Sequence, residues 1–225
     1  MLRKIYFLAV FFLLAVTSFA AKTKTIHVIP ETATIFVDGS EVGNGTYTLK
    51  FNYKTDFYVL RFEEPGYITK NVKLFKSNPN KTVAYTLVRD EALLNSSAST
   101  DGIDLANKWF DITCNGNLSD EEIWQRLMSI AITNFENVDI RDEAAGWIRT
   151  AWSVTSFPYQ SIRTRLEIKL SFSANDKKTF KVKLSSEIKE SDCYGNDECY
   201  QEYPRVLKKF DQVINEIQTS VGNKL

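Results

Sequence analysis

The sequence is poor in the residues that catalytic sites use most often. Its 225 residues include one histidine and three cysteines. His27 lies in the first half and every cysteine in the second, so a Cys-His pair would have to form across the two halves. The G-x-S-x-G elbow, the H-E-x-x-H helix, the P-loop and the G-x-G-x-x-G fingerprint are all missing. We therefore expect a non-catalytic protein with no cofactor and no metal site.

An excess of charge of one sign is also missing. Lys+Arg and Asp+Glu each total 28, which gives a formal net charge of zero. No global basic field exists to hold a nucleic-acid backbone, so we expect no nucleic-acid partner. With 44% hydrophobic and 25% charged residues, the composition is that of a globular protein.

The long apolar run of the chain lies at its start. Arg3 and Lys4 precede an apolar stretch at 5–16, and Ala20 closes a short segment with small residues. This pattern predicts a signal peptide at 1–20, cleaved between Ala20 and Ala21. An uncleaved anchor is the alternative, although the run of roughly 15 residues is short of the ~20 that span a bilayer. We expect an exported protein, periplasmic or at the cell surface, with no transmembrane segment after cleavage.

A change in composition near residue 90 predicts two domains. The stretch 91–103 is rich in serine and has no apolar period, so we interpret it as a linker between domains at 21–90 and 104–225. The first domain reads as short strands separated by turns, which predicts a small all-β sandwich. We expect its strands at 24–29, 33–37, 46–51, 57–63, 67–75 and 81–88.

Two turns in this first domain need a positive φ. Asp38 and Gly39 suit a tight hairpin, and Gly66 suits the turn that Pro65 begins. We therefore assign Asp38, Gly39 and Gly66 a structural role.

These residues belong to a recognisable pattern. It consists of Pro30-Glu31-Thr32-Ala33, Ile35-Phe36-Val37-Asp38-Gly39, Val42-Gly43 and Pro65-Gly66-Tyr67. Over about 24–89 the chain resembles the PEGA domain family, from which it departs at Thr32 and at Gly45-Thr46-Tyr47. The resemblance implies an extracytoplasmic accessory module of bacterial envelope proteins, without catalytic residues.

The second half mixes strand and helix periods. Ser119 and Glu122 form the pattern of a capping box, which predicts a helix that ends near Asn137. A last helix is expected from about Pro204 to Gly222, and strands at 108–113, 137–142, 146–154, 161–172 and 178–188. We expect an α+β domain, with one antiparallel sheet and two helices on one of its faces, because this arrangement would bury the apolar faces of the helices and strands.

This half resembles, through its topology, the helix-grip domains of envelope proteins, such as the family of the lipoprotein C subunit of the outer-membrane β-barrel assembly machinery. The carrying segments are the Trp124 helix, Phe135-Glu136-Asn137-Val138, Asp142-Glu143-Ala144-Ala145-Gly146 and Ile148-Arg149-Thr150-Ala151-Trp152. The lipidated cysteine of that lipoprotein has no counterpart here.

Strand alternation places basic residues and a tryptophan on the face away from the helices. The candidate binding residues are Trp147, Arg149, Arg163, Arg165, Lys181 and Lys183, and Lys169 and Glu167 accompany them. A solvated antiparallel face and a partner-binding face both fit this pattern. We interpret the protein as an adaptor that engages an envelope protein. The alternative is a glycan- or cell-wall-binding module, for which the sandwich would have to expose Tyr47, Tyr53, Phe57 and Tyr58.

Cysteine usage fits an exported protein. Cys193 and Cys199 bracket a short polar loop, and we hypothesise a disulfide between them. Cys114 is then left over, either buried or paired elsewhere. Three cysteines and one distant histidine lack the paired spacing of a zinc site.

Overall fold

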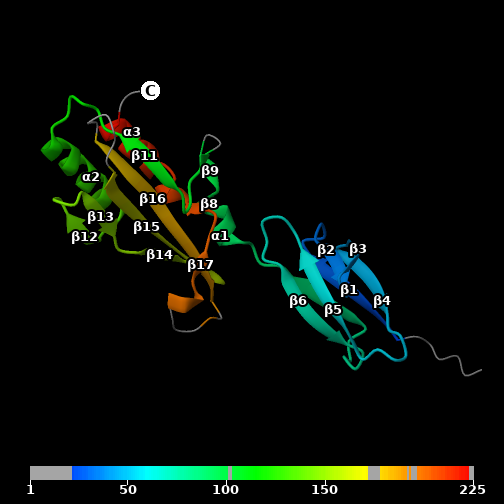
Figure 1. The fold of residues 1–225 in the computed structure, drawn as a ribbon. Coiled ribbons are helices and arrows are strands. Elements are labelled where there is room, and N and C mark those ends of the chain that lie inside the picture. Colours follow the sequence, from blue (N-terminus) through cyan, green and yellow to red (C-terminus); the bar gives the residue numbers. More distant parts are fainter. Residues whose placement is uncertain (1–21, 101–102, 172–177, 192, 194–196, 223–225) are drawn as a thin grey trace, which may run out of the picture. The chain divides into compact units, whose positions relative to one another are not determined.

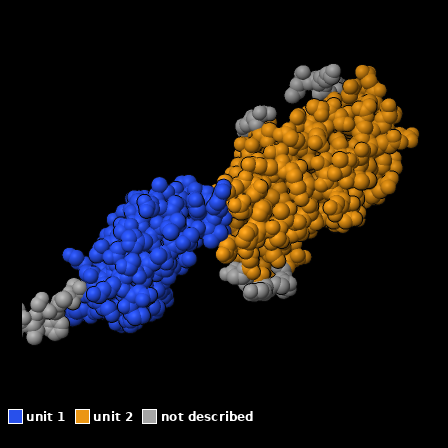
Figure 2. Space-filling view, turned by 180° about the vertical axis from the view of Figure 1, so that it is seen from behind, with its two compact units in different colours: residues 1–89 blue, residues 90–225 orange. Residues whose placement is uncertain are grey.

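The structure is a computed structural model, and it describes residues 22–100, 103–171, 178–191, 193 and 197–222. The predicted signal peptide at 1–20 lies outside the described residues. The chain divides into two compact units, 1–89 and 90–225, coloured separately in Figure 2. Strands predominate in both units (Figure 1).

Unit 1 consists of two sheets around one apolar core. The first has the order β4 (Thr46–Lys50), β1 (Thr23–Ile29), β7 (Thr82–Thr86), and the second β3 (Ser40–Asn44), β2 (Thr34–Val37), β5 (Phe57–Glu63), β6 (Lys70–Phe75). Only β1 and β7 pair in parallel among these strands. Ile26 and Ile35, one from each sheet, are fully buried in the shared core. The arrangement is sandwich-like.

Positive φ angles occur at the turns that the sequence marks. Asp38 (φ 46°) and Gly39 (φ 84°) form the β2–β3 turn, and the Asp38 carboxylate accepts a hydrogen bond from the Val59 N–H. Gly66 (φ 81°) lies between β5 and β6. The strand β3 that follows the first turn was not expected from the sequence, because its residues lack an apolar alternation.

Unit 2 is built on a long antiparallel sheet. Its order is β11 (Trp109–Thr113), β16 (Thr179–Glu190), β15 (Gln160–Ser171), β13 (Trp147–Thr150), β12 (Val138–Asp142). Two short strands extend it, since β14 (Ser153–Ser156) pairs with β15 and β17 (Gln201–Glu202) pairs with β16. The remaining elements are α1 (Glu91–Leu94), β8 (Ser96–Ser97), β9 (Ser99–Thr100), β10 (Ile103–Asp104), η1 (Asp197–Cys199), β18 (Val206–Leu207) and η2 (Lys208–Phe210).

Two helices, α2 (Asp120–Asn134) and α3 (Val213–Val221), cover one face of this sheet (Figure 1). The capping box at the start of α2 is present: the Glu122 N–H donates to the Ser119 hydroxyl, and the Glu122 carboxylate accepts from the Ser119 N–H. Leu127 of α2 and Ile217 of α3 are fully buried, in one cluster with Ile148, Leu166 and Val182 of the sheet. The apolar stripes of the helices and the alternating strands therefore share a core.

Two expectations about chain organisation are corrected. The segment 91–103 is not a simple linker, because Ala92 is buried in the core of unit 2 and β8 pairs with β18. The segment from Pro204 is not one helix, since Val206 and Leu207 are extended in that pairing and α3 begins only at Val213. The apolar residues of the expected helix are nevertheless all buried in the core: Val206, Phe210, Val213, Ile217 and Val221.

The expected strand 146–154 is also divided. β13 ends at Thr150, whose hydroxyl accepts the N–H of Leu166 on β15 in place of a main-chain carbonyl. The chain resumes as β14 at Ser153. Before the break the odd residues lie on the face away from the helices, and after it the even ones do, because Val154 pairs with Arg163.

Candidate functional site: the basic and aromatic face of the sheet

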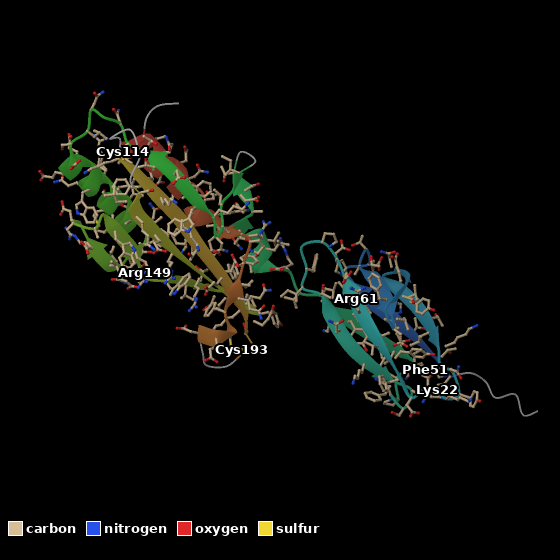
Figure 3. All side chains as sticks on the ribbon, in the orientation of Figure 1. Lys22, Phe51, Arg61, Cys114, Arg149 and Cys193 are labelled. Atoms are coloured by element: carbon tan, nitrogen blue, oxygen red, sulfur yellow. A yellow bond between two sulfur atoms is a disulfide. The ribbon has the colours of Figure 1, made fainter. Side chains whose placement is uncertain are left out.

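The face of the unit 2 sheet away from α2 and α3, called the open face below, carries every candidate binding residue of the sequence analysis. Residues paired across neighbouring strands point to the same side. The register pairs Trp147 with Lys169, and Lys169 with Lys181. It also pairs Arg149 and Lys183 with Glu167, Lys183 with Trp109, and Arg165 with Ser185. Figure 3 labels Arg149 on β13.

At one end of the open face, two tryptophans surround a lysine. The Lys169 Nζ lies 5.4 Å from the ring centre of Trp109 and 5.1 Å from that of Trp147, and the Lys183 Nζ lies 5.6 Å from that of Trp109. Trp147 Nε1 donates to Glu167 (3.2 Å), which also pairs with Lys169 (2.7 Å). Trp147, a candidate binding residue, is half-buried, whereas Trp109 is 43% exposed. The exposed indole of this cluster is Trp109.

At the other end, Arg163 is largely a structural residue. Its side chain is only 10% exposed and pairs with Glu187 (2.6 Å) and Asp197 (2.7 Å). Its guanidinium lies 4.5 Å from the ring centre of Trp152 and 4.0 Å from that of Tyr200. Burial raises the pKa of Tyr200 despite the nearby Arg163 charge. Arg163 therefore fastens the 197–200 segment to the sheet and is not available to a partner.

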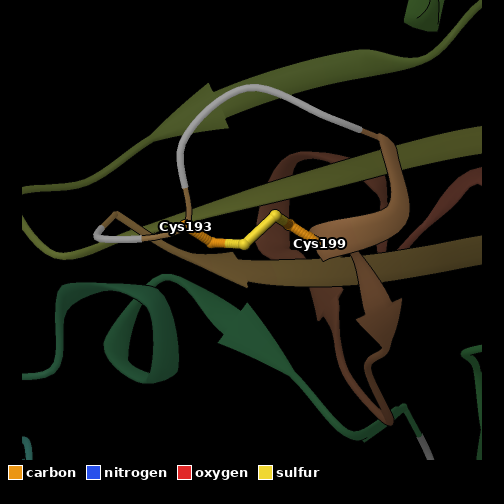
Figure 4. Close-up of a disulfide and its surroundings, with 2 residues drawn as sticks. All are labelled: Cys193 and Cys199. Atoms are coloured by element: carbon orange, nitrogen blue, oxygen red, sulfur yellow. A yellow bond between two sulfur atoms is a disulfide. The ribbon is translucent and has the colours of Figure 1, made fainter.

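The loop that Arg163 holds is closed by a disulfide. Cys193 and Cys199 are bonded, with their Cα atoms 6.1 Å apart (Figure 4). Asp197 and Cys199 belong to the same short helical turn, η1. The bond thus limits the conformations of the segment that supplies Asp197 and Tyr200 to Arg163. Cys114 is the unpaired cysteine and is buried, and desolvation raises its pKa to about 11.

Two arginines in the middle of the open face have unused hydrogen-bonding capacity. The Nε atoms of Arg149 and Arg165 are buried and have no hydrogen-bond partner among the described residues. Neither guanidinium forms a salt bridge with any of the described residues. Arg165 lies 4.3 Å from the ring centre of Trp152, and Arg149 5.9 Å from that of Trp147. Each guanidinium therefore lies near an aromatic ring and has no anionic partner among the described residues.

Three aromatic residues of this face, Trp109, Trp152 and Tyr200, were not predicted from the sequence. Trp109 is the first residue of β11 and lies on the open face by the alternation of that strand, so it could have been identified from the expected strand at 108–113. Trp152 could not, since the break between β13 and β14 changes the phase of the alternation. Tyr200 comes from a segment with no strand pattern.

Other candidate chemistry does not converge. Asp139, Asp142 and Glu143, the carboxylates of the β12–β13 region, are all exposed, and the Asp142 carboxylate accepts the Ala145 N–H within the turn. Among the described residues, no group of three or more His, Cys, Asp and Glu could hold a metal ion. A cavity of about 200 Å³ near Trp152 is lined by Glu136 and Lys209 among others. In the part of the chain that the structure describes, no helix is both long and apolar enough to cross a bilayer.

Comparisons with known proteins supply no family. No family model matches the chain, and no curated protein matches it. Among solved structures, it is similar to the crystal structure of a "putative membrane-associated protein of unknown function from Bacteroides fragilis NCTC 9343". The similarity has 10% sequence identity and a TM-score of 0.27, and covers 74% of this chain and 96% of that chain.

Proposed function

We propose that this chain is an exported, non-catalytic module of the bacterial cell envelope that binds a partner protein through the open face of unit 2. The observation that carries the proposal is the pair of arginines, Arg149 and Arg165, that lie 5.9 Å and 4.3 Å from the centres of tryptophan rings and have no anionic partner among the described residues. An exposed Trp109 lies on the same face. Arginine and tryptophan are the residues that most often dominate protein interfaces.

The chemistry of the face defines the kind of partner. Lys169 and Lys183 flank the Trp109 ring, and Lys181 is exposed on the same strand as Lys183. A complementary surface would offer carboxylates to the arginines and an apolar or aliphatic group to the indole. The signal peptide predicted at 1–20 and the resemblance of residues 24–89 to the PEGA family support the envelope as the location.

A glycan or cell-wall polymer is the second candidate. Exposed aromatic rings can stack on sugars, and Trp109 is one such ring. In the sandwich, Tyr53 is 79% and Phe57 39% exposed, whereas Tyr47 and Tyr58 pack against the core. Only part of the aromatic platform that this candidate needs is therefore accessible.

Crosslinking with mass spectrometry in native envelopes tests the proposal. The informative variant combines Trp109→Ala with Arg149→Glu and Arg165→Glu, and Lys208→Glu serves as the control because Lys208 is exposed outside the open face. We expect the variant to lose one defined protein crosslink that the wild type and the control retain. Unchanged crosslinks in a folded variant would refute the proposal. Trp109-dependent binding to purified cell wall, without any protein crosslink, would favour the glycan candidate.

A further inference from the structure

One end of unit 1 concentrates lysines and exposed aromatic rings. This end, called the lysine pole below, consists of residues 22–24, 50–57 and 75–82. The pairings Thr23 with Lys50, Thr25 with Thr82, and Phe57 with Phe75 bring these three segments together from both sheets. Lys22 and Phe51 lie side by side at this end in Figure 3, and the Phe51 N–H donates to the Lys22 carbonyl (2.9 Å).

The charge of the lysine pole is almost entirely positive. Its segments contain six lysines and a single carboxylate, Asp56. At the other end of the sandwich, the loops 30–33 and 63–69 contain three carboxylates, Glu31, Glu63 and Glu64, and Arg89 lies there as well, in a β-bridge with Tyr67. The net charge of the chain hides this separation, since it averages over both ends.

Two of the six lysines hold the pole in shape. Lys24 is buried, and its Nζ donates to the carbonyls of Asn78 (2.6 Å) and Asn80 (2.7 Å), which fixes the 76–81 loop. The Lys76 Nζ donates to the carbonyls of Asn52 and Tyr53 at 3.1 Å each and fixes the 51–56 loop. The other four point into solvent with exposed side chains: Lys22, Lys50, Lys54 and Lys81.

Three of the four aromatic rings of the pole are exposed, whereas Phe51 is buried in the core of unit 1. Tyr53 is 79% exposed, Phe75 47% and Phe57 39%. The Phe57 and Phe75 rings lie 5.5 Å apart, and Val59, 39% exposed, continues this apolar strip along β5. A contiguous exposed apolar patch rimmed by charge marks an interaction surface. An open cavity of about 360 Å³ beside it is lined by Lys22, Asp56, Phe75, Lys76 and Ser77.

We infer that the lysine pole binds the surface of an anionic lipid bilayer. Lysines attract lipid phosphates, and aromatic rings settle at the boundary between headgroups and acyl chains. Tyr53, Lys54 and Lys81 lie in the two loops of the pole. Lys50, Phe57 and Phe75 lie at the ends of the adjoining strands, so both kinds of side chain gather at one end of the sandwich. The apolar run at 5–19 ends just before Lys22, so the chain enters the sandwich at this same end.

Cosedimentation with lipid vesicles tests this inference on the chain from Ala21 onward, which lacks the apolar run. We expect binding to phosphatidylcholine vesicles that contain phosphatidylglycerol, weaker binding to phosphatidylcholine alone, and a decrease with added salt. Lys54→Glu with Lys81→Glu should lower the partition coefficient roughly tenfold or more. Lys70→Glu with Lys208→Glu changes the net charge equally outside the pole and should retain binding. Circular dichroism of each variant controls for folding.

The aromatic rings provide an independent arm. Tyr53→Ser with Phe75→Ser leaves every lysine in place and should also weaken vesicle binding, because a bilayer interface accepts the rings. Equal binding of the pole and control variants would overturn the inference. So would undiminished binding of the aromatic variant, or binding to soluble polyphosphate without binding to anionic vesicles. These variants leave the open face of unit 2 intact, so failure here is distinct from failure of the proposed adaptor function.

Discussion

Arg163 shows how a residue that the sequence marks as a binding candidate is used inside the fold. Its guanidinium joins β15 to Glu187 on β16 and to Asp197 in the disulfide loop. Asp197 is 89% exposed, so water screens that pair and it stabilises little. Glu187 is 28% exposed and would lose its partner in a partly buried site if Arg163 were removed.

We expect Arg163→Ala to lower the free energy of unfolding by about 1–3 kcal/mol, through the unpaired Glu187 and the lost stacking on Trp152 and Tyr200. Urea denaturation measures the change. Lys181→Ala is the matched control, because Lys181 is exposed on the same face, and its effect should stay within about 0.5 kcal/mol. Equal effects of the two substitutions would show that Arg163 is not structural.

Cys114 makes the free energy of unfolding decrease at alkaline pH. The residue is 3% exposed, and desolvation raises the pKa of its thiol from 9.0 to about 11 in the folded protein. Between these two values the folded chain keeps the proton while the unfolded chain releases it, so raising the pH favours unfolding. The contribution is present below pH 9 and is lost as the pH approaches 11.

Denaturation below pH 9 and near pH 11, for the wild type and Cys114→Ala, measures this contribution. We expect the wild type to lose about 2 kcal/mol more than the variant across that window. The comparison is needed because burial also raises the pKa of Tyr85 and Tyr203, which adds an alkaline loss that both proteins share. An identical pH dependence in the two proteins would contradict the expectation.

Among the elements, the hairpin between β12 and β13 depends on one glycine. Gly146 has a φ of +61°, and a Cβ placed on it would lie 2.6 Å from the Leu170 Cβ. The substitution would therefore meet both backbone strain and a clash with β15. The Leu170 N–H also donates to the Gly146 carbonyl, so the turn cannot move away without losing a hydrogen bond.

We expect Gly146→Ala to destabilise the protein by roughly 1–3 kcal/mol. Gly116→Ala is the control, since a Cβ at Gly116 meets nothing within 4 Å. Thermal unfolding of the two variants compares them directly. If Gly146→Ala unfolds like Gly116→Ala, the positive φ at the turn is not required.

The elements that could be predicted from the sequence are those with a strong local signal. The capping box at Ser119 and the alternation of β15 led to nearly correct elements. The helix predicted over residues 204–212 was wrong. The apolar spacing of this segment is helical, but its backbone pairs with Ser96–Ser97, over a hundred residues away in the sequence. The residues of the open face could be predicted where the strand alternation is unbroken. The prediction missed Trp152, because β13 ends at Thr150, whose hydroxyl accepts the Leu166 N–H, and the alternation changes phase after it. The local spacing of apolar residues carries no information about strand partners that are distant in the sequence or about hydrogen bonds made by side chains.

At the scale of the whole molecule, the division into two units allows each proposed surface to be tested on its own. The boundary falls between Arg89 and Asp90, whose carboxylate accepts the Leu93 N–H and so caps α1 of unit 2. Unit 1 has its own hydrophobic core between its two sheets, and unit 2 has a separate one. A sandwich of this size is within the range of domains that fold alone.

We therefore expect fragments 22–89 and 90–225 to fold separately, each with a cooperative thermal transition. Reduction of the Cys193–Cys199 bond should shift only the second transition, because the bond lies wholly in that fragment. Calorimetry of the fragments and of the intact chain measures both effects. A first fragment without a cooperative transition would show that the sandwich needs the rest of the chain. If it does fold, fragment 22–89 should keep the vesicle binding of the lysine pole, and fragment 90–225 the partner crosslink of the open face.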